Sequence, residues 1–144
     1  MSNWYKFTNT QYTSTGVLKV NPRVPWIKKD TTNWLIIQVN PDLSRYYLEL
    51  FNFHHRAKDL QIEKPAWGGH ISIIRGENIL DKEYFYSLQN KSIEFSYESD
   101  IVGNNSHYWL KVKCPEANEI RIKLGLQSDP PIPFHLTIGI VKKG

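Results

Sequence analysis

One order of structural signals occurs twice in this chain, and the repeat restricts the possible folds more than any other feature. Each copy has a strand, a proline at the start of a helix, a proline-containing turn and then a strand that begins with histidine. The copies span residues 34–75 and 107–141. Two such copies predict an α+β protein: a pseudo-twofold repeat of βαβ-type units with a central antiparallel sheet and one helix packed on each half.

The first copy begins with the apolar run 34–39, which is typical of a buried strand. Asn40 is the predicted N-cap of the helix that follows, and Pro41 occupies the first helical position. Apolar residues at helical spacing continue this helix to about Lys58. A turn with proline and glycine then precedes the second strand, 70–75.

The second copy has the same order although its sequence differs. Residues 107–113 alternate as a strand, and Cys114-Pro115-Glu116 ends that strand and starts a helix that extends to about Leu124. A proline-rich turn leads into the last strand, 134–141. Outside the two copies, the sequence predicts strands over 17–20 and 92–97, a turn at 103–105 and a short helix within 79–90.

The chain is expected to form one domain, because 144 residues fit a single core. Within it we expect an N-terminal segment over 1–33, a first lobe over about 34–90 and a second lobe over about 91–144. The segment 1–33 is long for a stretch with so little regular structure, which suggests a functional role. We expect Tyr12 and one lysine of the pair at 28–29, taken as Lys28, to contact the ligand.

Charge and composition narrow the classes of partner. The net charge of +4 suits a phosphate-bearing ligand, but no basic run exceeds two residues, so DNA is not an expected partner. No apolar run approaches the ~20 residues that cross a bilayer and no signal-peptide pattern is present, which predicts a cytoplasmic protein without membrane contact. Cys114 is the one cysteine and supports neither a disulfide nor a thiolate metal site.

Both strands that begin with histidine carry a hydroxyl residue two positions later. In a strand, residues i and i+2 share a face, so His70 and Ser72 point to one side, away from their apolar neighbours. His135 and Thr137 do the same in the last strand. If the pseudo-symmetry holds, the two strands lie side by side and the four polar side chains converge in one groove.

Such a group of side chains suits metal-independent cleavage of a phosphodiester. One imidazole can remove a proton from a nucleophilic hydroxyl while the other protonates the leaving oxygen. The two hydroxyls can donate hydrogen bonds to the non-bridging phosphate oxygens, which carry the charge of the transition state. The alternative interpretation is that both histidines are structural, with satisfied hydrogen bonds at the start of a strand.

At these residues the chain resembles the two-histidine phosphoesterase superfamily, whose mark is a pair of H-x-[ST]-hydrophobic motifs on the central strands of a bilobal fold. The resemblance rests on residues 69–77 (GHISIIRGE) and 135–139 (HLTIG), and it covers about residues 34–141. Within the superfamily the chain is most similar to the phage anti-CBASS phosphodiesterases. Ser72 stands where threonine is common, and it keeps the hydroxyl group.

The resemblance implies a phosphodiesterase that hydrolyses cyclic di- and trinucleotide signals, such as cGAMP, without a metal or cofactor, so that a phage evades host defence. The ribose 2′-OH attacks the adjacent phosphorus with help from one histidine, and the other protonates the departing 5′ oxygen. The expected protein is a monomer or weak homodimer in the host cytoplasm. The alternatives are a 2′,3′-cyclic phosphodiesterase of RNA ends, a 2′,5′-oligoadenylate phosphodiesterase, and a protein that sequesters a nucleotide signal without cleaving it.

Several other side chains carry weaker predictions. Trp67 lies in a turn shortly before the first motif, and it either stacks on a base or fills the junction beneath the lobes. Arg75 either holds a phosphate or forms a surface ion pair. Trp109 alternates within a strand and is expected in the core, and His107 is expected to be structural.

Overall fold

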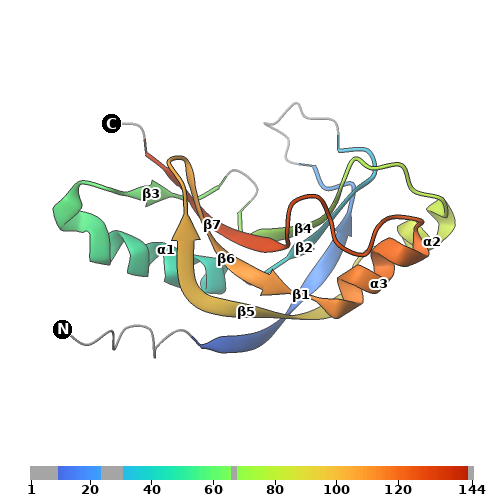
Figure 1. Ribbon diagram of the computed structural model, residues 1–144, viewed down its shortest axis with the longest axis horizontal. Coiled ribbons are helices and arrows are strands. Elements are labelled where there is room, and N and C mark those ends of the chain that lie inside the picture. The colour runs from blue at the N-terminus through green and yellow to red at the C-terminus, as the bar shows by residue number, and fades with distance from the viewer. Residues whose placement is uncertain (1–9, 24–30, 66–67, 143–144) are drawn as a thin grey trace.

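The structure is a computed structural model that describes residues 10–23, 31–65 and 68–142. Figure 1 shows the arrangement of its strands and helices. Their order and bounds are β1 (Gln11–Val20), β2 (Trp34–Gln38), α1 (Pro41–His55), a short 3-10 helix (Arg56–Lys58), β3 (Ile62–Glu63), β4 (His70–Arg75), α2 (Lys82–Ser87), β5 (Ser92–Gly103), β6 (His107–Lys113), α3 (Pro115–Lys123) and β7 (His135–Val141).

Six of the strands form a closed circle in the order β1-β2-β4-β7-β6-β5, and β5 pairs again with β1. The short β3 adds a seventh strand, paired with the C-terminal end of β7. Every pairing is antiparallel. The predicted α+β class and antiparallel sheet are therefore confirmed. The closed circle means that both halves of the chain share one sheet.

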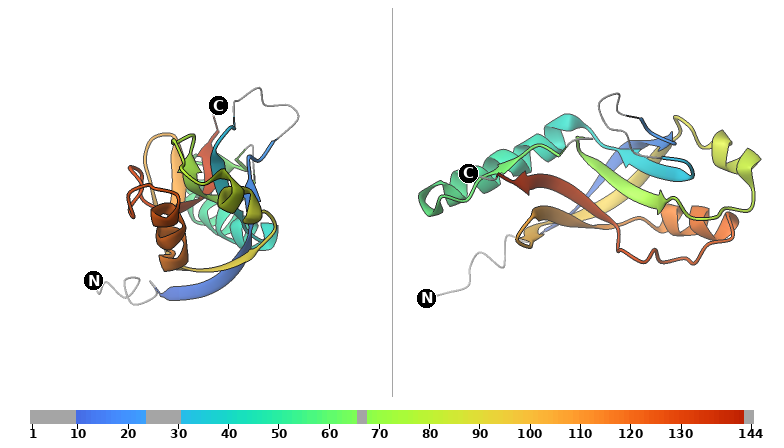
Figure 2. Two further views of the ribbon diagram at one scale, coloured as in Figure 1. Left: turned by 90° about the vertical axis from the view of Figure 1, so that its right-hand side faces the viewer. Right: turned by 90° about the horizontal axis from the view of Figure 1, so that it is seen from above.

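The pairings divide the circle into two similar halves. One half contains β1, β2, α1 and β4, and the other contains β5, β6, α3 and β7; within each, neighbouring strands follow the same order. Contacts between β4 and β7 and between β1 and β5 join the halves. Helices α1 and α3 lie at opposite ends of the molecule (Figures 1 and 2). The sequence repeat is thus visible in the fold and includes one more strand in each half than predicted.

The starts of the two long helices agree with their sequence signals. The Asn40 side chain accepts a hydrogen bond of 2.9 Å from the backbone N–H of Asp42, and Pro41 follows at the first helical position. Pro115 begins α3 in the same way, although Cys114 makes no capping bond with its side chain. None of the helices within the described residues is long and apolar enough to cross a membrane.

Two strands differ from their predicted extent. β1 begins at Gln11, so the expectation that segment 1–33 is irregular apart from 17–20 is wrong. The residues that extend β1 are mostly polar, and they form a strand because they pair with β5. β5 continues to Gly103, which we expected in a turn. A register shift between Tyr97 and Ile101 interrupts the alternation of β5, and this hides its second half in the sequence.

The hydrophobic core lies between one face of the sheet and the helices. Leu35, Ile71 and Leu136 project from three adjacent strands and are fully buried. Phe51 of α1 and Ile120 of α3 belong to the same cluster of buried residues. Because strand residues alternate between faces, the neighbours of Ile71 and Leu136 point to the opposite side of the sheet. The candidate site lies on that side.

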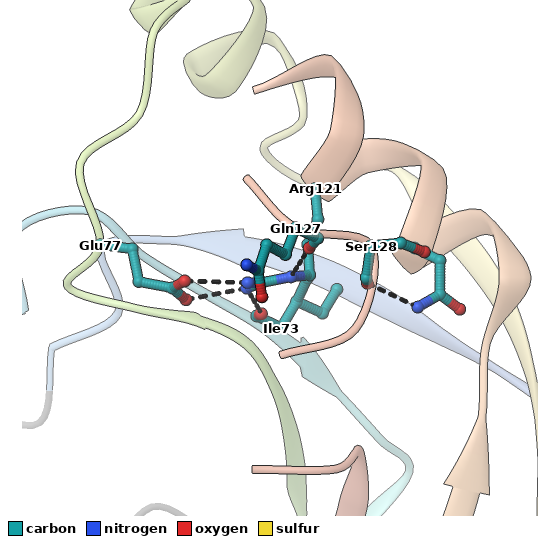
Figure 3. Close-up of polar contacts among 6 residues, drawn as sticks. Ile73, Glu77, Arg121, Gln127 and Ser128 are labelled. Atoms are coloured by element: carbon teal, nitrogen blue, oxygen red, sulfur yellow. Dashed lines mark hydrogen bonds and ion pairs between the residues drawn. The ribbon is translucent and has the colours of Figure 1, made fainter. Parts of the chain in front are cut away.

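A buried arginine links α3 to β4 through hydrogen bonds (Figure 3). Arg121 is 1% exposed and donates two hydrogen bonds of 2.8 Å to the carboxylate of Glu77. It also donates to the carbonyl oxygens of Ile73 (2.9 Å) and Gln127 (2.8 Å). A buried charge needs such a complete set of partners. Arg121 therefore connects the helix of the second half to the motif strand of the first half.

Candidate active site

The two motif strands are neighbours. β4 and β7 run antiparallel with Ile71 opposite Leu136. In an antiparallel pair, this register places His70 beside Thr137 and Ser72 beside His135. Each histidine therefore lies next to the hydroxyl residue of the other motif, on the face away from the core. This is the arrangement that the repeat predicts.

Both histidines make the same local hydrogen bond. Nδ1 of His70 lies 3.1 Å from the carbonyl oxygen of Gly68, and Nδ1 of His135 lies 2.8 Å from that of Pro133. In each case the partner is the residue two positions earlier. A carbonyl can only accept, so Nδ1 carries the proton and each neutral ring keeps its lone pair on Nε2. Both rings are thus held in the tautomer that can act as a base at Nε2.

Two glycines directly before the first motif allow the backbone to turn there and to pack closely against α1. Gly68 has a φ of +71°, a backbone conformation that favours glycine, and its carbonyl is the one that His70 contacts. At Gly69 a Cβ atom would lie 2.5 Å from Oγ of Ser44 in α1. This helix therefore packs directly against the residue before the histidine, and glycine is required for the contact.

A shift of register in β4 brings a positive charge to the site. Successive residues of β2 pair with Ser72 and with Ile74, so Ile73 is skipped. Without the shift, alternation would place Arg75 on the core face, opposite to Ser72. With it, both residues share the polar face. Bulges commonly re-aim side chains next to active sites.

The same irregularity occurs in β7. Successive residues of β6 pair with Thr137 and with Gly139, so Ile138 is skipped. Ile138 follows its hydroxyl residue directly, as Ile73 does in β4. The two motif strands therefore share three features: the histidine bond to a carbonyl, the hydroxyl residue and the bulge after it.

A cavity of about 730 Å³ lies beside β7. A ligand could reach the motif residues through this cavity. Its described lining includes three cationic side chains, those of Arg75, Lys111 and Lys113, and one carboxylate, that of Glu98. This balance of charge favours an anionic ligand. His135 and Thr137 also line the cavity, whereas His70 and Ser72 do not. The first motif therefore lies next to the cavity, on the adjoining strand.

The surroundings of His135 favour its neutral form. Burial lowers the pKa of His135; the hydrogen bond to Pro133 acts in the opposite direction, and the charges of Arg75 and His107 lower the pKa further. A neutral imidazole with Nδ1 protonated presents a basic Nε2. His135 is thus placed to accept a proton near neutral pH.

The two hydroxyl residues differ in exposure. Thr137 is half-buried and lines the cavity. Ser72 is only 5% exposed and lies opposite the buried Ile36 of β2. A phosphate that reaches both hydroxyls must therefore sit deep against the junction of β4 and β7.

Arg75 adds a positive charge to the cavity lining beside the motif pair. It is half-buried, it lines the cavity beside His135, and burial lowers the pKa of its guanidinium. The charge of Glu77 acts in the opposite direction on that pKa. The carboxylate of Glu77 is itself bound by Arg121, so the guanidinium of Arg75 can face the ligand.

Tyr12, a predicted ligand contact, is not among the residues that line the cavity. The Tyr12 ring packs against Tyr97, with 5.7 Å between ring centres, on the same side of the sheet as α1. Its neighbour Gln11 is the residue of β1 that lines the cavity. Lys28 and Trp67 lie outside the described residues.

Two residues that we expected to be structural lie in the cavity instead. Trp109 is half-buried and lines it, with its ring 6.0 Å from that of His135, so its expected place in the core is wrong. His107 is exposed and lines the cavity as well. The alternation of β6 could have identified this face, because Leu110 and Val112 are the buried apolar residues of that strand.

Within the described part of the chain, no three His, Cys, Asp or Glu side chains are grouped as ligands for a metal ion. Comparison of the chain with protein-family models, with curated proteins and with solved structures finds no match.

Proposed function

We propose that this protein is a metal-independent phosphodiesterase that cleaves 3′–5′ linkages of cyclic di- and trinucleotides by attack of the ribose 2′-OH. The observation that carries the proposal is the duplicated geometry of His70 and His135. Both present Nε2 on one face of adjacent strands, and each lies beside the hydroxyl residue of the other motif. A paired acid and base needs two proton-transferring groups within reach of one phosphate, and this geometry supplies them.

In the first step His135 acts as the base. Its Nε2 accepts the proton of the 2′-OH while the 2′ oxygen forms a bond to phosphorus. The bond between phosphorus and the 5′ oxygen breaks, and His70, protonated on both nitrogens, gives its Nε2 proton to that oxygen. The products are a 2′,3′-cyclic phosphate and a free 5′-OH. Ser72, Thr137 and Arg75 stabilise the charge on the non-bridging oxygens.

In the second step the two histidines exchange roles. His70, now neutral, accepts a proton from water while the water oxygen attacks phosphorus. The bond to the 2′ oxygen breaks, and His135 returns its proton to that oxygen. A terminal 3′-phosphate results and both histidines regain their starting forms. The cycle balances protons without a further reactant.

The size and charge of the cavity support an oligonucleotide ligand rather than a neutral one. A volume of about 730 Å³ lies within the range of roughly 300–1,000 Å³ typical of small-molecule sites, and the cationic lining suits phosphates. The two halves of the sheet are then the lobes of a two-histidine phosphoesterase, which meet at β4 and β7. Removal of a cyclic nucleotide signal is the means by which such a protein helps a phage evade host defence.

A panel of substrates tests this proposal. The protein is incubated in EDTA with cyclic di- and trinucleotides, 2′,5′-oligoadenylate and an RNA that ends in a 2′,3′-cyclic phosphate, and products are separated by chromatography. We expect linear products from a 3′–5′ cyclic ligand. His70→Ala and His135→Ala should each lower the rate by roughly 100- to 10,000-fold. His54→Ala is the matched control, since His54 is exposed on α1.

The other outcomes separate the alternatives. Cleavage of the oligoadenylate or the RNA end alone keeps the mechanism and replaces the substrate. Ligand that is depleted from solution but recovered unchanged after denaturation indicates sequestration. Turnover of a 2′-deoxy cyclic dinucleotide at a comparable rate contradicts attack by the 2′-OH.

A further inference from the structure

The face that carries the two motifs continues onto β6. In the register of β6 and β7, Trp109 lies opposite Thr137 and Lys111 lies opposite His135. Residues directly opposite in an antiparallel pair have Cβ atoms about 4.5–5.5 Å apart. A ligand whose phosphate lies at the junction of β4 and β7 therefore extends over β6 with the groups that are bonded to that phosphate.

Trp109 offers an aromatic surface at this place. Its side chain is half-buried in the cavity lining, and its ring meets that of His135 in an edge-on arrangement with 6.0 Å between centres. The two ring planes are inclined at 63°, so the imidazole does not lie flat on the indole. Stacking on aromatic side chains is a general way to hold a nucleobase, because every base has a π-face.

Lys111 offers a positive charge in the adjacent position. It is exposed, it lines the cavity, and it forms no ion pair with a carboxylate of residues 10–23, 31–65 and 68–142. An ammonium group that is free of a carboxylate can bind a phosphate. Lys113 follows on the same face and extends the positive charge along β6.

On the other side of the motif pair, the two positions directly opposite His70 and Ser72 carry neither an aromatic ring nor a charge, and Trp34 lies further along β2, opposite Arg75. There β2 places Gln38 beside His70 and Ile36 beside Ser72. Ile36 is buried, and neither side chain is charged or aromatic. Among the described residues, the positions directly opposite the two motifs therefore carry an aromatic ring and a cation on β6, and a glutamine and an isoleucine on β2.

We infer that Trp109 and Lys111 form a subsite for the nucleoside and the adjacent second phosphate on the His135 side of the scissile linkage. The inference rests on the proposed function and deepens it. A substrate with at least two phosphates then binds more tightly than a dinucleoside monophosphate. The nucleoside stacked on Trp109 is the one whose 2′-OH faces His135.

Kinetics with paired variants test the subsite. Trp109→Leu keeps an apolar side chain but removes the π-face, and it should raise KM for a cyclic dinucleotide roughly tenfold with little change in kcat. Trp109→Phe should keep most of the affinity. Lys111→Gln should raise KM for the cyclic dinucleotide about tenfold. It should leave KM for a dinucleoside monophosphate of the same bases unchanged, and Lys111→Arg should restore binding of the cyclic ligand.

Lys58→Gln is the matched control, because Lys58 is exposed on the short 3-10 helix outside the cavity. If the wild type cleaves the cyclic dinucleotide and both KM values stay unchanged in Trp109→Leu and Lys111→Gln, the subsite is wrong and the proposed function stands. If the wild type cleaves nothing, the proposed function fails, and calorimetric binding of the cyclic dinucleotide decides the subsite. Weaker binding by both variants supports it, and unchanged binding overturns it.

Discussion

Glu77→Ala is expected to destabilise the fold by about 3 kcal/mol. The substitution removes the carboxylate that binds Arg121 through two hydrogen bonds of 2.8 Å. Arg121 is 1% exposed, so its charge stays buried after its counter-charge is lost. Its remaining partners are the carbonyl oxygens of Ile73 and Gln127, which are neutral.

The magnitude follows from the burial of the two partners. Removal of one member of a fully buried ion pair costs about 3–5 kcal/mol. The Glu77 side chain is 27% exposed, so water can reach the guanidinium once the carboxylate is gone. The expected cost therefore lies at the lower end of that range. With an m-value of about 2 kcal/mol/M, it lowers the urea midpoint by about 1.5 M.

Equilibrium unfolding in urea, followed by tryptophan fluorescence, measures this loss. Arg45→Ala is the control, because Arg45 and Asp42 also form an ion pair of 2.7 Å but their side chains are 66% and 72% exposed. The control should lose less than about 0.5 kcal/mol. If Glu77→Ala loses no more than Arg45→Ala, the reasoning about burial is refuted.

The dependence of stability on pH gives a second readout of the same ion pair. Hydrogen bonds from Arg121 lower the pKa of Glu77 below its ordinary 4.5, against the raising effect of burial. A carboxylate with a lowered pKa contributes its full stability above its unfolded pKa and loses that stability as the pH falls through the folded value. The difference in the free energy of unfolding between wild type and Glu77→Gln should therefore decrease as the pH falls through the acidic range. A difference that persists at low pH contradicts the ion pair.

Three further predictions concern the site. Because the pKa of His135 is lowered from 6.5, the acid limb of kcat/KM should be centred below that pH; an acid limb centred above it contradicts the role of base. Ser72→Ala and Thr137→Ala should each lower kcat on the order of 100-fold while Ser72→Thr keeps activity, and unchanged alanine variants would remove the hydroxyls from the mechanism. Gly69→Ala should destabilise the fold by about 1–3 kcal/mol in thermal melts, since its Cβ would lie 2.5 Å from Oγ of Ser44; an unchanged melting temperature refutes that contact.

Much of the local structure could be predicted because its signals are local. The alternation of 70–75 and 107–113 identifies β4 and β6 with their observed bounds. Asn40 and the two helix-initiating prolines identify the starts of α1 and α3. The repeat of these signals also predicts that the motif strands lie side by side.

The position of Arg75 could not be predicted, because it depends on pairing. Plain alternation puts Arg75 on the core face with Ile71 and Ile73. Only the skipped pairing with β2 turns it toward Ser72. Nor does any pattern connect Arg121 with Glu77, which are 44 positions apart in the chain. Such contacts arise from the tertiary fold.

The position of Trp109 was open to prediction but was missed. We expected it in the core because it lies within an alternating strand, without asking which face of the strand it occupies. The alternation of β6 pairs it instead with Lys111 on the polar face, opposite to Leu110. The face that a strand residue occupies therefore has to be read from the charged and apolar residues that alternate with it.

The most direct test of the central claim is phosphorus NMR of a cyclic dinucleotide incubated with the protein in EDTA. The paired action of His70 and His135 predicts that a 2′,3′-cyclic phosphate signal appears first and is then replaced by a terminal 3′-phosphate. In His135→Ala neither signal should develop on the same timescale. A 5′-phosphate product, or a cyclic phosphate that forms equally fast in His135→Ala, would contradict the account.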